Sequence, residues 1–344
     1  MSEAHFYHIT KDGSLTQLSS AENALEVVKS GGYIWLDYYH PTKEELSMLI
    51  EPLGLHPLSI EDCIDENQIP KVDDYPRNTF ILFNAFHYYQ GKLSISEVDA
   101  FLGRDFLVTV SSQNSHKRSP LSNIQRSVEN ERESARNGPA FLLHIILDQV
   151  VDEKFQAIEA LEEKLNEGEE TILSSLENFD PSDLMHLRRD LLGVRKSLFH
   201  EREILVKICR KDSPFIPDNA IYLYRDIYDH LSKFFELTES YRDLVTSLME
   251  MYLSMLNNQM TKTANETNIV VRRLTFITTI FMPLTLLAGI GGMSEWSMMT
   301  GPQNWRIAYP LFLLVMVILG LVNYFFLKWM EKRRSLKSRS GEDA

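Results

Sequence analysis

The chain has 344 residues with 48 acidic and 35 basic side chains, which gives a formal net charge of −13. No basic patch precedes the C-terminal tail, so we do not expect the chain to bind nucleic acid. The sequence has no nucleotide-binding glycine loop, no paired histidines of a zinc protease and no spacing typical of a catalytic triad, so we do not expect an enzyme. Cys63 and Cys209 lack the spacing of metal ligands and are expected to be free thiols.

Residues 1–138 alternate short apolar runs with helix signals and predict a mixed α/β domain. Its predicted strands are rich in aromatic and β-branched residues and are separated by glycines. These strands are Tyr33–Tyr39, Thr79–Tyr89, Glu97–Leu102 and Phe106–Val110. A helix is predicted over Pro41–Pro52, because Pro41 and Thr42 are typical of a helix start and two glutamates follow in the first turns.

Residues 139–212 predict a helical hairpin. Its first helix covers Phe141–Leu176, where apolar residues recur at a spacing of three and four. Asp180 is typical of a capping residue, and Pro181 then occupies the first helical position of a second helix that runs to about Cys209. Two prolines between residues 212 and 219 indicate a break after it.

One very long helix is predicted from about Ala220 into an apolar span, so that it makes up most of residues 213–293. No glycine or proline interrupts it before Pro283. A helix of about 70 residues would be about 100 Å long. Because a helix of this length needs partners along its side, we expect it to be the stalk of an oligomer.

Two uncharged stretches of about 20 residues each predict membrane-spanning helices. They are Leu274–Met293 and Ile307–Leu327. Arginines immediately precede the first span and six lysines and arginines follow the second, so both termini are expected on the cytoplasmic side of the inner (plasma) membrane. The predicted segments are therefore 1–138 (α/β domain), 139–212 (helical hairpin), 213–293 (stalk and first span), 294–306 (extracytoplasmic loop), 307–328 (second span) and 329–344 (basic tail).

A semi-polar seam, neutral except for one acid at its cytoplasmic end, repeats along the long helix with alternating spacings of three and four. Its members are Glu250, Leu253, Asn257, Met260, Ala264, Thr267, Val271, Leu274, Thr278 and Thr285. The bases Lys262, Arg272 and Arg273 all fall outside it. A dry coiled-coil core would favour leucine, isoleucine and valine at these places. The pattern therefore suits either a pore that water can enter or close packing between membrane helices.

Several motifs together resemble the CorA magnesium and cobalt transporter family, over roughly residues 30–330. The resemblance is carried by GLHPLSIEDC at residues 54–63, QIPKVDDY at 68–75, YRDIYDH at 224–230, MEMYLS at 249–254 and IFMPLTLLAGI at 280–290. It implies an α+β cytoplasmic domain, a long stalk helix and two membrane helices in a funnel-shaped homopentamer. The first span would line the pore, and the second would form an outer ring.

The chain departs from the family pattern at the outer end of the first span. The family hallmark there is Tyr-Gly-Met-Asn, whereas this chain has Gly291-Gly292-Met293-Ser294. The resemblance places Gly292, Met293 and Ser294 at the selectivity filter, with Glu295 as the one acid left in the loop. Five serines would form a wider and weaker ring than five asparagines, so we expect weaker discrimination among cations. The stalk also has about seven more residues than the family pattern, which keeps the phase of the seam.

The resemblance assigns roles to further residues. Thr285 would offer hydroxyls to a passing ion, and Met282, Leu274 and Val271 would form an apolar gate. Thr278, Asn257 and Glu250 would also line the pore, with Glu250 concentrating cations at its inner mouth.

The resemblance also implies a regulatory Mg²⁺ site at Asp226, which Asp229 one turn later would assist. In the family an acid from the next subunit completes this site. We take Glu97 and Asp99 as candidates for that acid.

The sequence therefore predicts a channel for Mg²⁺, with Co²⁺ and Ni²⁺ as further candidates. Mg²⁺ would be both transported and regulatory, without an organic cofactor, and the partners would be other copies of the chain, divalent ions and membrane lipids. Inward movement of a divalent cation is favoured by about 4.6 kcal/mol per 100 mV of membrane potential, so no enzymatic step is needed. Two alternatives stay open, namely a proton-coupled zinc transporter and a non-conducting sensor or scaffold with a degenerate filter.

Overall fold

The computed structural model describes residues 3–28, 31–65, 68–111, 121, 124–292, 301 and 304–339, of which Trp305 and the last ten only as backbone. The chain divides into two compact units, Met1–Tyr252 and Leu253–Ala344. The helix α9 (Ile221–Gly291) runs from the first unit into the second. Each unit is described by itself below.

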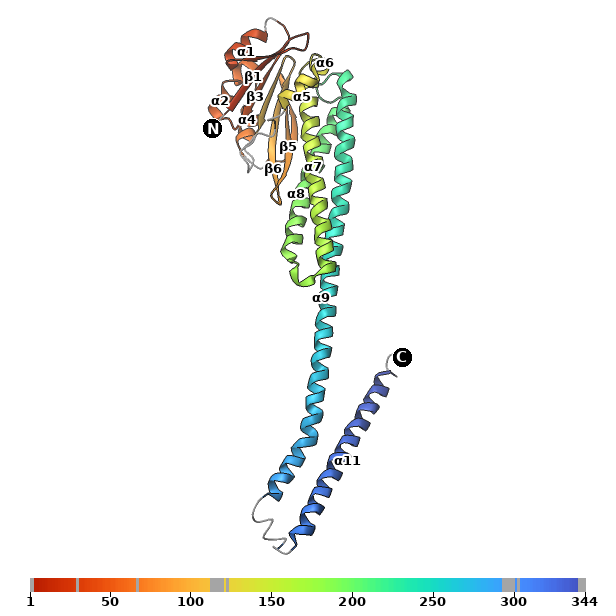
Figure 1. Cartoon of the computed structure of the whole chain (residues 1–344). Coiled ribbons are helices and arrows are strands. Elements are labelled where there is room, and N and C mark those ends of the chain that lie inside the picture. The colour runs from red at the N-terminus through yellow and green to blue at the C-terminus, as the bar shows by residue number, and fades with distance from the viewer. Residues whose placement is uncertain are drawn as a thin grey trace. The chain divides into compact units, whose positions relative to one another are not determined.

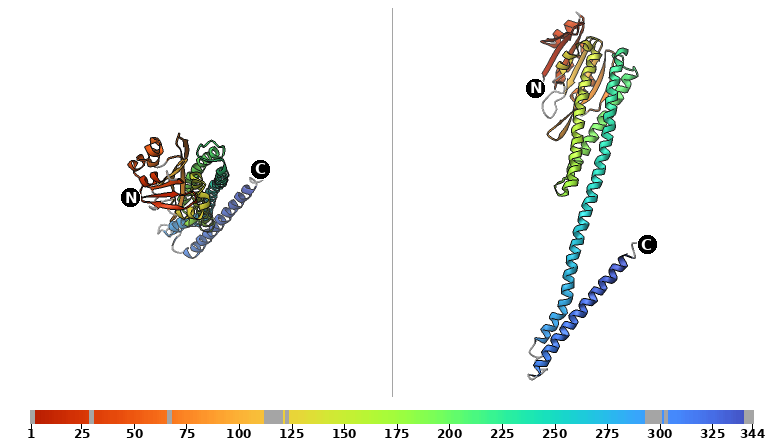
Figure 2. Two further views of the ribbon diagram at one scale, coloured as in Figure 1. Left: turned by 90° about the horizontal axis from the view of Figure 1, so that it is seen from above. Right: turned by 45° about the vertical axis from the view of Figure 1, so that its right-hand side comes forward.

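The first unit contains a seven-stranded sheet with the order β2-β1-β3-β7-β6-β5-β4 (Figures 1 and 2). Its strands are β1 (Glu3–Ile9), β2 (Leu15–Leu18), β3 (Tyr33–Tyr39), β4 (Lys71–Asp74), β5 (Asn78–Tyr89), β6 (Lys92–Gly103) and β7 (Phe106–Ser111). Only β3 and β7 are parallel, with Ile34 opposite Phe106, and the other neighbours are antiparallel. The mixed α/β prediction is thus confirmed for this unit.

The longest strands, β5 and β6, form one hairpin. They pair over twelve residues, from Asn78 opposite Gly103 to Tyr89 opposite Lys92. Gln90 and Gly91 in the turn both have positive φ, at 49° and 79°. Two such residues between paired strands form the type I′ geometry that matches the natural twist of a hairpin. The turn explains why β6 starts five residues earlier than the sequence predicted.

Short helices cover one face of the sheet. They are α1 (Ala21–Val27), α2 (Lys43–Ser47), α3 (Ile50–Leu53) and α4 (Pro57–Ile64). The prediction of one continuous helix over Pro41–Pro52 is wrong, because this segment forms two separate helices, α2 and α3. The proline at 52 has no N–H for the carbonyl of Met48, so one helix could not continue through both. The start of α2 is a complete capping box between Thr42 and Glu45.

The other face is covered mainly by two long helices (Figure 1). They are α7 (Pro139–Ser174) and α8 (Pro181–Cys209), joined through the short 3₁₀ turn Leu176–Asn178, and the short helices α5 (Ile124–Asn130) and α6 (Arg132–Ala135) pack against α7. A second 3₁₀ turn, Asp218–Ala220, leads from α8 into α9. Asp180 accepts a hydrogen bond from the backbone N–H of Ser182, as its predicted capping role requires. Because both faces of the sheet are covered, β5 to β7 are buried along most of their length.

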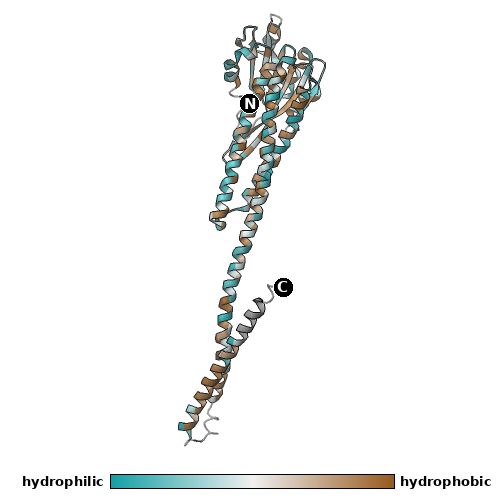
Figure 3. Ribbon diagram, turned by 90° about the vertical axis from the view of Figure 1, so that its right-hand side faces the viewer, coloured by the Kyte–Doolittle hydropathy of each residue, from teal (hydrophilic) through white to brown (hydrophobic). Residues whose placement is uncertain are grey.

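The second unit holds the rest of α9 and the helix α11 (Trp305–Arg339). Two helices, Asp218–Gly291 and Arg306–Trp329, are long and apolar enough to cross a membrane. Figure 3 shows their apolar residues concentrated along the end of α9 and along α11. The prediction of one uninterrupted helix of about 70 residues is confirmed, because α9 has 71 residues.

Candidate functional site

The apolar part of α9 packs against α11 along one face. Its half-buried residues on α9 are Phe276, Thr279, Ile280, Leu284, Leu287 and Gly291, and those on α11 are Ala308, Phe312, Met316, Gly320, Asn323 and Leu327. A Cβ built on Gly291 would lie 2.7 Å from the Phe312 ring, and one built on Gly320 would lie 3.6 Å from Leu284. These glycines let the two helices approach closely, as is typical of membrane helix pairs.

The candidate pore residues lie on the opposite side of α9. At 100° per residue, the mean direction of Val271, Leu274, Thr278, Met282 and Thr285 differs by about 180° from that of the residues facing α11. All five are exposed, and the exposed fraction of Met282 is 76%. These five residues therefore form a surface that α11 does not cover, as a pore-lining face in an oligomer requires.

The threonine hydroxyls of this face donate to backbone carbonyls of their own helix. Thr278 donates to the carbonyl of Leu274 at 3.0 Å, and Thr285 donates to the carbonyl of Phe281 at 2.8 Å. A hydroxyl that gives its hydrogen to its own helix keeps its lone pairs as acceptors. Water around a hydrated cation donates hydrogen bonds, so these oxygens are suited to a cation with its water shell.

The predicted filter beyond the seam is only partly described. Gly292 follows the last turn of α9, where its N–H donates to the carbonyl of Ala288 at 3.0 Å. Met293, Ser294 and Glu295 lie outside the described residues. At the other end, Glu250 and Asn257 are both exposed on α9.

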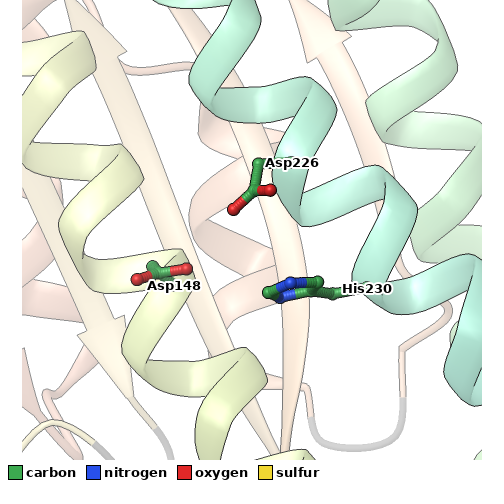
Figure 4. A group of neighbouring side chains, drawn as sticks. All are labelled: Asp148, Asp226 and His230. Carbon is green, nitrogen blue, oxygen red and sulfur yellow. The ribbon is translucent and has the colours of Figure 1, made fainter.

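A second cluster of ligating side chains lies in the first unit. Asp148 of α7 meets Asp226 and His230 of α9, and one ligand atom from each lies within 4.8 Å of the others (Figure 4). Asp226 and His230 are one turn apart on the same helix face. Ligands around one small cation lie about 3–5 Å apart, since each is about 2.0–2.6 Å from the ion. The three side chains therefore fit a single divalent cation.

Several contacts fix α7 against α9 on both sides of this cluster. The Tyr224 hydroxyl donates to the carbonyl of Ala140 at 2.6 Å. Further along, the rings of Phe155 and Phe234 stack with centroids 5.7 Å apart. The Tyr241 hydroxyl then donates to a carboxylate oxygen of Glu162 at 2.6 Å. This parallel packing holds Asp148 opposite Asp226 and His230.

The electrostatics of the cluster suit a cation. Burial raises the pKa of Asp148, and the nearby carboxylates of Asp152 and Asp226 raise it further, while His144 and His230 lower it. Burial lowers the pKa of His144, one turn before Asp148, against the opposing effect of Asp148 and Asp226. A bound divalent cation would offset the repulsion between the acids. The imidazole nitrogen also suits Co²⁺ or Ni²⁺ better than Mg²⁺, which favours oxygen ligands.

The structure separates the other predicted regulatory residues from this cluster. Asp229 lies near Cys209 of α8, where burial raises the pKa of the thiol and the charge of Asp229 raises it further. Glu97 and Asp99 are buried in the sheet, with exposed fractions of 7% and 2%. Glu97 accepts from the backbone N–H of Gln68, and burial raises the pKa of Asp99 well above its usual range. These two acids are thus poorly placed to reach a neighbouring subunit.

Sequence reasoning missed Asp148 and His230. The four-residue spacing between Asp226 and His230 is visible in the sequence and could have indicated a shared helix face. The pairing of α7 with α9 is set by tertiary packing, so no local signal points to Asp148.

Known proteins resemble the chain over nearly its whole length. The cobalt/magnesium transport protein CorA of Thermotoga maritima is 30% identical over 282 residues, covering 81% of this chain and 77% of that protein. The protein of the same name from Methanocaldococcus jannaschii is 26% identical over 314 residues, covering 90% and 95% of the two chains. The complete structure of the CorA magnesium transporter from M. jannaschii shares the fold, with a TM-score of 0.67, 24% identity and coverage of 94% and 96%.

A family model agrees with these relatives. The model described as CorA-like Mg²⁺ transporter protein matches residues 30–333, which is well over half of the chain. The chain therefore belongs to the CorA-like Mg²⁺ transporter family.

Proposed function

We propose that the chain forms a homopentameric channel that carries Mg²⁺, and also Co²⁺ or Ni²⁺, across the plasma membrane. The observation that carries this proposal is the uncharged, threonine-bearing face of α9 on the side away from α11. In a ring of five copies, these faces would surround a central path while α11 faced lipid. The family membership and the CorA relatives support the choice of ion.

The pore would conduct hydrated ions. Mg²⁺ gives up its water shell reluctantly, so a path lined by hydrogen-bond acceptors is better suited to it than one that must strip the waters. Thr278 and Thr285 would accept hydrogen bonds from the ion's waters. Gly292, Met293 and Ser294 would form the outer filter, with Glu295 near its entrance. Glu250 and Asn257 would lie toward the inner end of the path.

The gate would be apolar. Val271, Leu274 and Met282 project from the same side of α9 as the threonines and are exposed in the single chain. Five copies of these side chains around a narrow path would exclude water in the closed state and so block a hydrated ion. Movement of α9 would open the path without any covalent step.

The cluster of Asp148, Asp226 and His230 would be the regulatory site. Its residues come from two helices of the cytoplasmic part, and Asp226 and His230 are exposed. Bound Mg²⁺ or Co²⁺ would hold α7 and α9 together and stabilise the closed assembly. A fall in the cytosolic cation concentration would then empty the site and release the closed assembly. Both termini would lie in the cytoplasm, in keeping with the bases that flank the two spans.

The test is flux into liposomes that hold a magnesium-sensitive dye, under an inside-negative potential. We expect the wild-type protein to carry Mg²⁺, and Ser294→Asn to discriminate more strongly against competing Ni²⁺ and hexaammine cobalt. The reason is that the longer carboxamide brings acceptors closer to the ion's waters.

The same preparation separates the alternatives. Zinc flux that depends on a proton gradient, without magnesium flux, would favour proton-coupled zinc transport. Intact pentamers that carry no ion in either variant would favour a sensor or scaffold. Flux in Ser294→Asn alone would show that the native serine ring does not conduct Mg²⁺.

A further inference from the structure

The transmembrane part of α9 continues through Pro283. Proline has no backbone N–H, so the carbonyl of Thr279, four residues earlier, loses its usual helical donor. The proline ring also crowds that carbonyl and favours a bend. In a bilayer core, water does not replace the missing donor, so the carbonyl needs a partner from elsewhere in the protein.

That partner comes from the other membrane helix. The side-chain amide of Asn323 in α11 donates to the carbonyl of Thr279 at 3.4 Å. Asn323 is the one asparagine or glutamine in residues 307–327, which are otherwise almost wholly apolar. A carboxamide in a membrane span is costly unless it is hydrogen-bonded. The Asn323 amide therefore supplies the donor that the Thr279 carbonyl lacks, and this carbonyl supplies an acceptor for the amide.

The register of the helix pair supports this contact. Gly291 lies against Phe312, and Leu284 lies against Gly320. The contact between Thr279 and Asn323 continues this antiparallel series toward the inner end of the pair. Asn323 also belongs to the half-buried stripe of α11 that faces α9, so its position follows from the packing of the whole pair.

We propose that Asn323 is a positioning residue for the gate, which replaces the backbone donor that Pro283 removes and so holds the bend of α9. The proposal rests on the proposed channel function. Thr278 directly precedes Thr279, and Met282 directly precedes Pro283, but both project from the face of α9 opposite to α11, toward the candidate pore. The hydrogen bond thus ties the orientation of the gate residues to α11, a helix that does not line the pore.

A double-mutant cycle on the full-length protein tests the proposal. Asn323→Leu removes the donor at similar size, and Pro283→Ala restores the backbone N–H to Thr279. We expect Asn323→Leu to change magnesium flux by about threefold or more when Pro283 is present, which is the effect of one hydrogen bond on an equilibrium. In the presence of Pro283→Ala, the same substitution should change flux less than about 1.5-fold. Equal effects in both backgrounds would overturn the proposal, because a packing role would not depend on Pro283.

Met316→Leu is the matched control. Met316 lies on the same stripe of α11 but offers no donor. Its effect should be the same with and without Pro283→Ala. If Asn323→Leu alone does not assemble, a double variant that does assemble would support the proposal, and a double variant that also fails would overturn it.

The thermal midpoint of the same purified variants gives a readout that needs no flux. We expect Asn323→Leu to lower the midpoint only when Pro283 is present. If the effect of Asn323→Leu on the midpoint depends on Pro283 but the wild-type protein carries no flux, the positioning role stands and the channel function is rejected. If the wild-type protein carries flux but the effects of Asn323→Leu on midpoint and flux do not depend on Pro283, the channel function stands and the positioning role is rejected.

Discussion

A fully buried ion pair joins three elements of the first unit. Lys154 of α7 donates to Glu201 of α8, and both side chains have no exposed surface. The other oxygen of Glu201 accepts from the backbone N–H of Asn84 in β5 at 2.9 Å. The rings of Phe83 and Phe86 lie 4.8 Å from the ammonium group. This network holds the helix that carries Asp148 against the sheet.

Lys154→Met should destabilise the protein strongly. The substitution keeps the length of the side chain but leaves the Glu201 carboxylate buried without a cation. Removal of one partner of a buried pair costs about 3–5 kcal/mol of unfolding free energy. The measurement is chemical unfolding of the full-length protein followed by tryptophan fluorescence, in which Trp35 in the core of the sheet reports on the first unit.

The double variant Lys154→Met/Glu201→Gln is the control. Glutamine keeps an acceptor for the N–H of Asn84 and removes the unpaired charge, so most of the lost stability should return. If the double variant is as unstable as the single one, the loss comes from packing around the lysine rather than from the charge.

At the scale of elements, long or strongly patterned segments were predictable. The strands β3, β5 and β7 were found within one residue at each end, because apolar residues on both faces distinguish them. The strands β1, β2 and β4 were missed. They lie toward the two edges of the sheet, and β2 and β4 are only four residues long with no buried residue. Short polar segments form strands because they pair with neighbouring strands, and the local sequence does not reveal this pairing.

For the long helix α9 as well, the local sequence predicted some features, while others depend on tertiary packing. Its length follows from the absence of glycine and proline before Pro283, and the structure confirms it. The three-four spacing also located a distinct face. The sequence left open whether that face packs or lines a pore. Its exposure opposite the contact with α11 favours a pore, because the packing face is formed by other residues.

Cysteine accessibility distinguishes the two faces of α9 experimentally. After replacement of Cys63 and Cys209 by serine, single cysteines at Thr278 and Thr285 should react with a membrane-impermeant thiol reagent in the conducting protein. Cysteines at Leu284 and Leu287 should react at least tenfold more slowly, because α11 covers that side. The reaction rate is measured as loss of flux or as mass added to the protein.

A protective ion gives the control for this scan. Hexaammine cobalt at the pore mouth should slow the reaction at Thr278 and Thr285 without affecting the slow positions. Equal rates on both faces would mean that α9 does not line an aqueous path.

At the scale of the whole molecule, one helix carries both candidate sites. The cluster at Asp148, Asp226 and His230 and the pore face at Thr278–Thr285 both depend on α9, which is continuous from Ile221 to Gly291. A cation bound by Asp148, Asp226 and His230 would fix the first end of α9 against α7, and the same helix carries the proposed gate residues. Coupling of this kind is reciprocal, so opening of the gate should weaken cation binding at the cluster.

Asp148→Asn should therefore abolish the stabilisation of the protein by divalent cations. A cation at about 100 times its dissociation constant stabilises the folded form by about 2.7 kcal/mol, which for a unit of this size corresponds to about 5–10 °C in thermal midpoint. The wild-type protein should show this shift with Mg²⁺, and at lower concentration with Co²⁺, because His230 offers a nitrogen ligand. The variant keeps the shape of the side chain but lacks the charge that attracts the ion.

Asp229→Asn is the matched comparison, because it removes the same charge from α9 three residues after Asp226 of the cluster. The structure places Asp229 toward α8, so this variant should retain most of the cation-dependent shift. Equal losses in both variants would point to a diffuse effect of negative charge. Retention of the shift in Asp148→Asn would mean that the cations act elsewhere, and α7 would then have no part in holding the stalk closed.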